Sequence, residues 1–217
     1  MDTVTPPYRR SLADGLTLSS IASEDDLRRV STFNRVIHGS GVADMTRELV
    51  LHHQNTRPEQ WLYVANDVGQ VVSTSCLIPW TWSYDGVPLR VGEIGIMGTH
   101  KTYRHRGLVH AQFERHHEML RQGGYDLAVI QGIPYFYRQF GFEYAIPLEG
   151  GWRVELYAVP PLQEGEREPY TFRLATERDI SALSRMYDQA AADLDVHALR
   201  DAAVWQYLLG PSTRTEM

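Results

Sequence analysis

Hydrophobic and polar residues alternate with two different periods along the first two-thirds of this chain. The stretch 16–22 alternates residue by residue, which predicts a β-strand. Ser23 then offers a helix N-cap and is followed by three acidic residues, with apolar positions at Leu27, Val30 and Phe33. This pattern predicts an amphipathic helix that begins directly after Ser23.

The remaining elements follow from the same two periods and from the turn residues between them. A second helix is predicted over 44–53, and another between Gly107 and the pair Gly123-Gly124. Further strands are predicted over 60–66, 71–80, 87–99, 125–132 and 152–159, and a short helix over 134–141. The order β-α-α-β-β-β-α-β-α-β indicates an α/β fold for a first domain of residues 1–158.

The chain after residue 158 differs from this domain. Residues 159–169 are rich in proline and charge, which is typical of a linker. The segment 175–187, "ATERDISALSRMY", resembles 22–34, "ASEDDLRRVSTFN", and the same offset carries Arg47-Glu48 to Arg200-Asp201. Two interpretations stay open: a coincidence between common helix starts, or a tandem repeat in which 170–217 begins a second, truncated copy.

Composition narrows the class of protein. The chain has 217 residues and a formal net charge of −6, which argues against nucleic-acid binding because phosphate needs a basic face. We expect no membrane span, since no apolar run reaches about 18 residues, and no secretory signal at the N-terminus. Oligomer formation is left open.

Sulfur and imidazole groups give little sign of special chemistry. Cys76 is the single cysteine and stands in an apolar run, so we expect a small buried hydrophobe and a reducing, cytoplasmic setting. The nine histidines include the pairs His52-His53 and His116-His117 but no HxxxH or HExxH spacing. No metal site is therefore predicted.

The stretch 102–111, "TYRHRGLVHA", surrounds Gly107 with basic residues where a strand pattern ends and a helix pattern begins. One interpretation is a tight strand-to-helix turn and nothing more. The other is an anion site, because a helix N-terminus presents free N–H groups and Arg104 and Arg106 add donors suited to phosphate. A diphosphate would suit it, although the glycines match neither GxxxxGK[ST] nor GxGxxG.

Two motifs resemble one known family. The run Arg104, His105, Arg106, Gly107, Leu108 and Val109 resembles the Arg-x-x-Gly-x-small pyrophosphate loop of the Gcn5-related N-acetyltransferases (GNAT family). The segment 135–145, "YFYRQFGFEYA", resembles that family's YYxxFGF segment. The resemblance spans residues 14–158 and implies a mixed, mostly antiparallel sheet flanked by helices. Two positions depart from the pattern: Val109 replaces the usual Gly or Ala, and Lys101 replaces a frequent proline.

The resemblance also implies where the substrates lie. The loop amides would hold the pyrophosphate of acetyl-CoA, and backbone groups at Met97, Gly98 and Thr99 would pair with the pantetheine arm like an added strand. The acceptor would lie near the first two helices and the loop 79–88. The aromatic residues that could offer surface for an amine there are Trp61, Trp80, Trp82 and Tyr84, although plain packing is the more common role of such residues.

Two residues are candidates for proton transfer. The resemblance maps the acid that protonates the leaving thiolate onto Tyr137, with Tyr135 and Tyr144 as competitors and a core tyrosine as the plainer interpretation. Glu93 is a lone acid in an apolar strand, 11 residues before Arg104, a spacing at which some histone-type members carry a catalytic glutamate. A solvated strand acid, or water acting as the base, remains an alternative.

The resemblance therefore implies an N-acetyltransferase that moves the acetyl group of acetyl-CoA to a primary amine by direct attack. The acceptor is a small molecule or a peptide amine of unspecified identity. A catalytically weak acyl-CoA-binding regulatory module is the alternative from another class. If 170–217 begins a second copy, the chain resembles the N-terminal part of an Eis-like tandem member.

Overall fold

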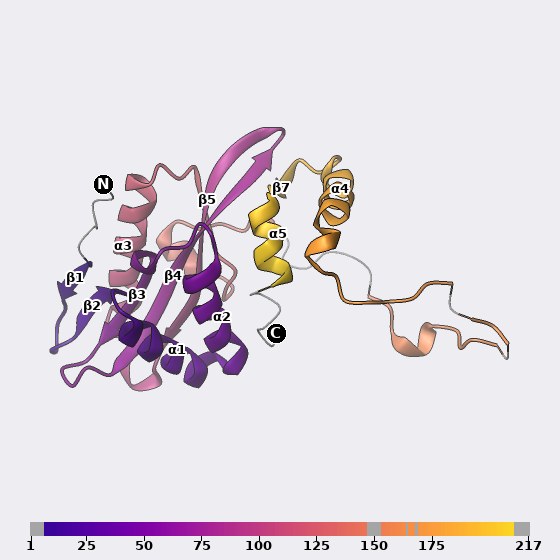
Figure 1. Ribbon diagram of the computed structural model, residues 1–217. Helices are drawn as coiled ribbons and strands as arrows, with labels where there is room; N and C mark the ends of the chain where they lie inside the picture. The colour runs from indigo at the N-terminus through magenta and orange to yellow at the C-terminus, as the bar shows by residue number, and fades with distance from the viewer. Residues whose placement is uncertain (1–6, 147–152, 164, 168, 211–217) are drawn as a thin grey trace.

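A seven-stranded mixed sheet forms the centre of the protein, seen here in a computed structural model that describes residues 7–146, 153–163, 165–167 and 169–210 (Figure 1). The strand order is β1-β2-β3-β4-β5-β6, and β7 pairs with β4. All pairs are antiparallel except β5 with β6, which is parallel. The strands are β1 Arg9–Ser11, β2 Thr17–Ser20, β3 Trp61–Ala65, β4 Val71–Tyr84, β5 Val87–Thr99, β6 Leu127–Val129 and β7 Val196–Ala198.

Helices cover both faces of this sheet. The helices α1 (Glu24–His38) and α2 (Ser40–His52) lie on one face, and α3 (Leu108–Gln122) lies on the other (Figure 1). Two later helices are α4 (Ile180–Ala191) and α5 (Ala202–Leu209). The short 3-10 turns are η1 Pro58–Gln60, η2 Lys101–Tyr103, η3 Phe136–Phe140, η4 Leu156–Ala158 and η5 Glu177–Asp179. The mixed, mostly antiparallel α/β fold predicted from the sequence is confirmed. No helix in the described ranges has the length and hydrophobicity needed to cross a membrane.

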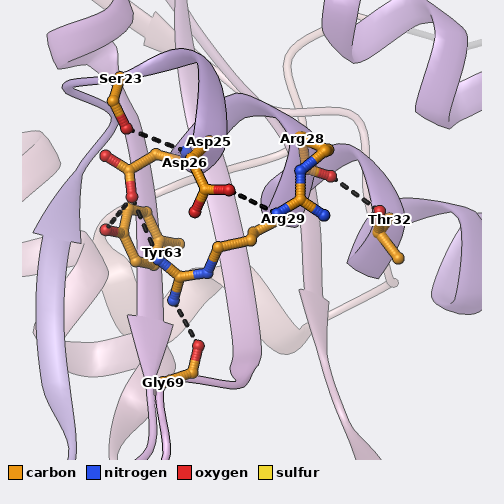
Figure 2. A network of polar contacts seen from close by, with 8 residues as sticks. All are labelled: Ser23, Asp25, Asp26, Arg28, Arg29, Thr32, Tyr63 and Gly69. Carbon is orange, nitrogen blue, oxygen red and sulfur yellow. Dashed lines mark hydrogen bonds and ion pairs between the residues drawn. The ribbon is translucent and has the colours of Figure 1, made fainter.

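The start of α1 is fixed by the cap that the sequence predicted (Figure 2). The Ser23 hydroxyl accepts a hydrogen bond from the Asp26 N–H at 3.1 Å. The Asp26 carboxylate in turn accepts the Tyr63 hydroxyl of β3 at 2.8 Å and pairs with Arg29 at 3.2 Å. Arg29 also donates to the Gly69 carbonyl. This network ties the first turn of α1 to the sheet.

β4 distributes its side chains between the two helix layers. Cys76 and Ile78 belong to the apolar core beneath α1 and α2. Leu77 faces the other way and packs with Ile94 and Phe113 beneath α3. Burial raises the pKa of the Cys76 thiol, which donates to the Gly95 carbonyl at 3.3 Å, so this cysteine is the inert core residue that the sequence predicted.

Two predicted strands differ from the structure. The strand predicted over 152–159 is wrong in its described part, because residues 153–155 are irregular and η4 follows them; position 152 lies outside the described residues. Val154 is 64% exposed and Tyr157 is 89% exposed, so neither side chain packs in a core. The buried strand predicted over 125–132 shortens to β6, which is exposed or half-buried because it lies at the sheet edge.

The C-terminal segment returns to the sheet. The described residues of 153–176 run away from it, but β7 pairs with the end of β4, with Ala198 opposite Trp82 (Figure 1). Tyr207 of α5 is buried in the core beneath α1 and α2. The division at residues 158 and 170 stays a prediction, and the packing of β7 and α5 crosses it.

The two segments related by the sequence offset begin their helices alike. In each, an aspartate of the first turn accepts a backbone N–H from the residues just before the helix: Asp179 from Thr176 at 2.9 Å, and Asp26 from Ala22, one position earlier in the offset, at 3.1 Å. Downstream they differ, since Arg47 lies within α2 whereas its counterpart Arg200 precedes α5.

Candidate active site

β5 and β6 separate along their length, which leaves one edge of β5 without a strand. Their pairing covers three residues on each strand and ends at Glu93 and Val129. Beyond Glu93, β5 continues to Thr99 with β4 as its strand neighbour in the described part of the chain. A β-bulge lies in this stretch, where Ile96 has a φ of 46°. Backbone groups of this free edge are available to a ligand.

The loop that follows β5 ends in an uncapped helix N-terminus. Gly107 is the N-cap of α3, with φ 73° and ψ 9°, and no described side chain accepts the first N–H groups. The first backbone bond of the helix runs from the Ala111 N–H to the Gly107 carbonyl at 3.0 Å. The preceding amides of the turn therefore point out of the helix end, where the dipole adds partial positive charge.

The need for Gly107 is conformational. A Cβ atom placed there would meet nothing within 4 Å, so the surface is open with or without a side chain. Its positive φ lies in the left-handed region that disfavours other residues. The left-handed turn, and not room for a ligand, is therefore the reason for a glycine at this position. His105 shares a positive φ, of 62°.

The two loop arginines are held differently. The Arg106 guanidinium lies 5.0 Å from the centre of the Tyr103 ring and 3.8 Å from the Asp14 carboxylate. Arg104 makes one long bond, 3.5 Å from its Nε to the Thr99 carbonyl. Both side chains are exposed, so the loop presents two cations beside the free amides of α3.

Three of the predicted site residues meet at the place where β5 and β6 separate. Met97 of β5, Val109 of α3 and Tyr137 of η3 all pack against the cluster around Phe113. Ile130, directly after β6, packs against the same cluster. The fold thus brings the free edge of β5, the N-terminus of α3 and the candidate acid to one location.

Gly98 and Thr99 face the helices and β4. A Cβ atom at Gly98 would come within 2.9 Å of the His38 Nε2 atom and 3.0 Å of the Ile37 Cγ2 atom, so this glycine permits the packing of α1. The Thr99 hydroxyl lies 2.8 Å from the Ser73 hydroxyl. Pairing of Met97, Gly98 and Thr99 with a pantetheine arm stays a prediction.

Tyr137 is half-buried and has a free hydroxyl among the described residues. Its ring packs so closely on Gly132 that a Cβ atom there would lie 2.0 Å from it, and its centre lies 6.0 Å from that of Phe113. Burial raises the pKa of Tyr137, which keeps the phenol protonated. The residue lines a cavity of about 600 Å³, whose other walls are formed by 130–135, 138 and 142–146.

The competing tyrosines are engaged with each other. Tyr135 and Tyr144 are 71% and 61% exposed, and their ring centres lie 5.8 Å apart. The Tyr135 N–H donates to the Tyr144 hydroxyl. Both line the same cavity as Tyr137, but neither belongs to the cluster around Phe113.

Glu93 lies on the other face of the sheet. It stands opposite Ile78 in the β4–β5 register, and its carboxylate accepts the Trp80 indole N–H at 2.6 Å. Trp80 packs against the core beneath α1 and α2. Glu93 is therefore half-buried and hydrogen-bonded, at the last residue pair before β5 and β6 separate. Sequence reasoning missed this contact, because it joins diagonal neighbours across two strands.

The predicted aromatic surface is only partly present. Trp61 is 1% exposed and belongs to the core, so its expected place beside an acceptor is wrong. Trp80 and Trp82 are half-buried and Tyr84 is exposed. Within the described ranges, no group of three or more His, Cys, Asp or Glu side chains is arranged to hold a metal ion.

A family model described as "Acetyltransferase (GNAT) domain" matches residues 24–145, more than half of the chain. No curated protein matches the sequence. The match includes α1, α2, the whole loop before α3 and the segment that carries Tyr137.

Three solved structures are similar to this chain at low sequence identity, and the two with TM-scores above 0.5 show the same fold. The N-myristoyltransferase of Saccharomyces cerevisiae with bound myristoyl-CoA is 12% identical over 91% of this chain and 51% of its own, with a TM-score of 0.64. The GNAT family N-acetyltransferase YhbS of Escherichia coli in complex with CoA is 21% identical over 63% of this chain and 73% of its own, with a TM-score of 0.52. A probable N-acyltransferase from Enterococcus faecalis is 18% identical over 58% of this chain and 32% of its own, with a TM-score of 0.49. The chain thus spans about a third to a half of the first and third of these proteins.

Proposed function

Because the chain belongs to the GNAT acetyltransferase domain family, we propose that it is an acyl-CoA-dependent N-acyltransferase that moves an acetyl group to a primary amine. The observation that carries the proposal is the convergence at the gap between β5 and β6. There the uncapped N-terminus of α3, the free edge of β5 and Tyr137 meet.

The donor site follows from charge and main-chain geometry. The pyrophosphate would accept hydrogen bonds from the amides of the first turn of α3, with Arg104 and Arg106 adding charge-assisted donors. The pantetheine arm would then run along β5 from Thr99 toward the bulge, pairing with free backbone groups. Bound CoA in YhbS and bound myristoyl-CoA in N-myristoyltransferase support a CoA thioester as the donor.

The chemistry needs one proton removed and one supplied. The amine attacks the thioester carbonyl carbon, a C–N bond forms, and the C–S bond breaks as the thiolate departs. Tyr137, protonated because of its raised pKa, gives its proton to the sulfur. Glu93 accepts the proton lost by the amine, directly or through a water. Holding both reactants in line at the gap supplies much of the acceleration.

The test is release of free thiol from acetyl-CoA in the presence of a panel of primary amines. Thiol release that depends on both the amine and the protein, with the acetylated amine detected by mass spectrometry, is the expected result. A regulatory module that binds acyl-CoA without turnover would release none. The presence of both the loop and Tyr137 favours the enzyme.

We also propose that residues 170–217 begin a second GNAT-like copy after a linker over 159–169. At the sequence offset Ser23, the N-cap of α1, corresponds to Thr176, the N-cap of the 3-10 turn η5 that leads directly into α4, and this supports the proposal. The half-buried Ile180 and Leu183 and the 65% exposed Met186 occupy positions that correspond to the core stripe of α1.

A further inference from the structure

A second cavity lies on the Glu93 side of the sheet, between the end of α2, β4 and the C-terminal segment. Its volume is about 240 Å³, and its walls include Gln54, Trp80, Asp201 and Val204. Trp80 connects it to the candidate base, because the same indole that lines the cavity donates its N–H to Glu93.

The C-terminal wall of this cavity is fixed to the first domain. The Leu199 N–H donates to the Thr81 carbonyl at 2.8 Å, directly after the pairing of β7 with β4. Gln54 donates to the Asp201 carboxylate at 3.1 Å. Val204 is buried, as are Trp205 and Tyr207 of the same helix. Although Asp201 lies 43 residues beyond position 158, it is a built part of the cavity.

Asp201 carries a negative charge at this wall. Its carboxylate accepts the Val204 N–H at 2.9 Å as the N-cap of α5. This bond, together with that from Gln54, lowers the pKa of Asp201. The neighbouring cation, Arg200, lies over the rings of Tyr187 and Trp205, 4.2 and 5.2 Å from their centres.

A carboxylate beside an indole is a combination that recognises ammonium groups, through charge and through the face of the ring. We propose, on the basis of the function proposed above, that this cavity holds a second, cationic group of the acceptor. Asp201 binds that ammonium, the carbon chain passes Trp80, and the reacting amine lies near Glu93. The acceptors are then amines with a second positive charge, and the C-terminal segment determines this specificity.

The test compares 1,5-diaminopentane with n-pentylamine as acceptors, in the wild type and in Asp201→Asn. Asparagine keeps the N-cap of α5 and the contact with Gln54 but removes the charge. We expect the wild type to prefer the diamine in kcat/KM, and Asp201→Asn to lose about tenfold of that preference through KM. The KM for acetyl-CoA should not change, and the effect of Asp201→Asn on n-pentylamine should be much smaller than its effect on the diamine. Asp188→Asn, on exposed α4, is the charge-matched control.

Calorimetric binding of 1,5-diaminopentane tests the cavity without turnover. Diamine binding that is weakened in Asp201→Asn but kept in Asp188→Asn supports the inference. This holds even if the protein releases no thiol from acetyl-CoA, because the absence of thiol release would overturn only the proposed function. The inference is overturned if the wild type releases thiol with the same kcat/KM for both amines, or if Asp201→Asn keeps the wild-type preference for the diamine. Either result leaves the proposed function intact.

Discussion

Glu93 and Tyr137 lie on opposite faces of the sheet, on either side of the gap where β5 and β6 separate. Glu93 is opposite Ile78 and bonded to Trp80, whereas Tyr137 packs on Phe113. A thioester placed in that gap would have a carboxylate on the acceptor side and a protonated phenol on the thiolate side. The sheet keeps the two groups apart, so each can serve a different reactant.

Tyr137→Phe should lower kcat by about tenfold or more and leave the affinity for acetyl-CoA nearly unchanged. The hydroxyl has no described partner, so its loss should also leave the free energy of unfolding within about 0.5 kcal/mol. Steady-state kinetics and urea denaturation measure the two effects. Tyr144→Phe is the matched control, and equal activity of the two variants would move the acid elsewhere.

Glu93→Gln should lower kcat by about tenfold or more, because glutamine cannot accept the proton of the amine. Its side-chain oxygen can still accept the Trp80 indole N–H, so folding should be preserved. The intrinsic fluorescence of the variant checks that this contact survives. A wild-type rate in Glu93→Gln would assign the base to water and remove Glu93 from the mechanism.

Gly107→Ala should weaken CoA binding and cost about 1 kcal/mol of stability, since alanine is strained at a φ of 73° although the space is open. Gly98→Ala is the informative comparison, because its Cβ would press on Ile37 and His38 and cost about 1–3 kcal/mol by displacing α1. Calorimetry measures the affinity of each variant for CoA, and thermal unfolding measures its stability. Wild-type affinity for CoA in a folded Gly107→Ala variant would contradict the proposal that this loop binds the pyrophosphate.

His116 makes the stability depend on pH. It is fully buried in α3, its Nε2 lies 2.8 Å from the Ser75 hydroxyl, and its Nδ1 has no partner in the described ranges. Burial, more than the nearby His117 and Arg115, lowers its pKa to about 3. The unfolded chain binds a proton here below about pH 6.5 and the folded chain does not. The stability from neutral His116 is therefore complete above that pH and is lost as the pH falls toward about 3.

His116→Gln should remove this part of the pH dependence. The difference in unfolding free energy between wild type and variant should shrink by about 1.4 kcal/mol per pH unit below about pH 6.5. Urea denaturation at several pH values measures it. Burial also lowers the pKa of His53. Because His53 is present in both proteins, its contribution cancels in the difference between their unfolding free energies. Parallel pH profiles would show that His116 is protonated in the folded state.

Local signals made part of this structure predictable from the sequence. Ser23 marks the start of α1, and Gly107 marks the start of α3, because caps and left-handed turns depend on neighbouring residues. The strand predicted over 152–159 is absent from the described residues because alternation indicates a strand only where one face is buried, and Val154, on the apolar face of the pattern, is exposed.

Contacts between segments that are distant in the sequence could not be predicted. The loop before α3 is contiguous, so its residues could be named from the sequence. The bond from Trp80 to Glu93 depends on strand register, and the place of Asp201 beside Gln54 depends on how α5 packs. Sequence reasoning noted Asp201 only as a repeat position, and its one usable signal was an N-cap residue before the apolar run of α5.

A crystal structure with bound acetyl-CoA tests the central claim most directly. We expect pyrophosphate oxygens within about 3.2 Å of the amide nitrogens of Gly107, Leu108 and Val109, and the thioester in the gap between β5 and β6 near Tyr137. A pyrophosphate bound anywhere other than the N-terminus of α3, or a thioester outside that gap, would contradict the account.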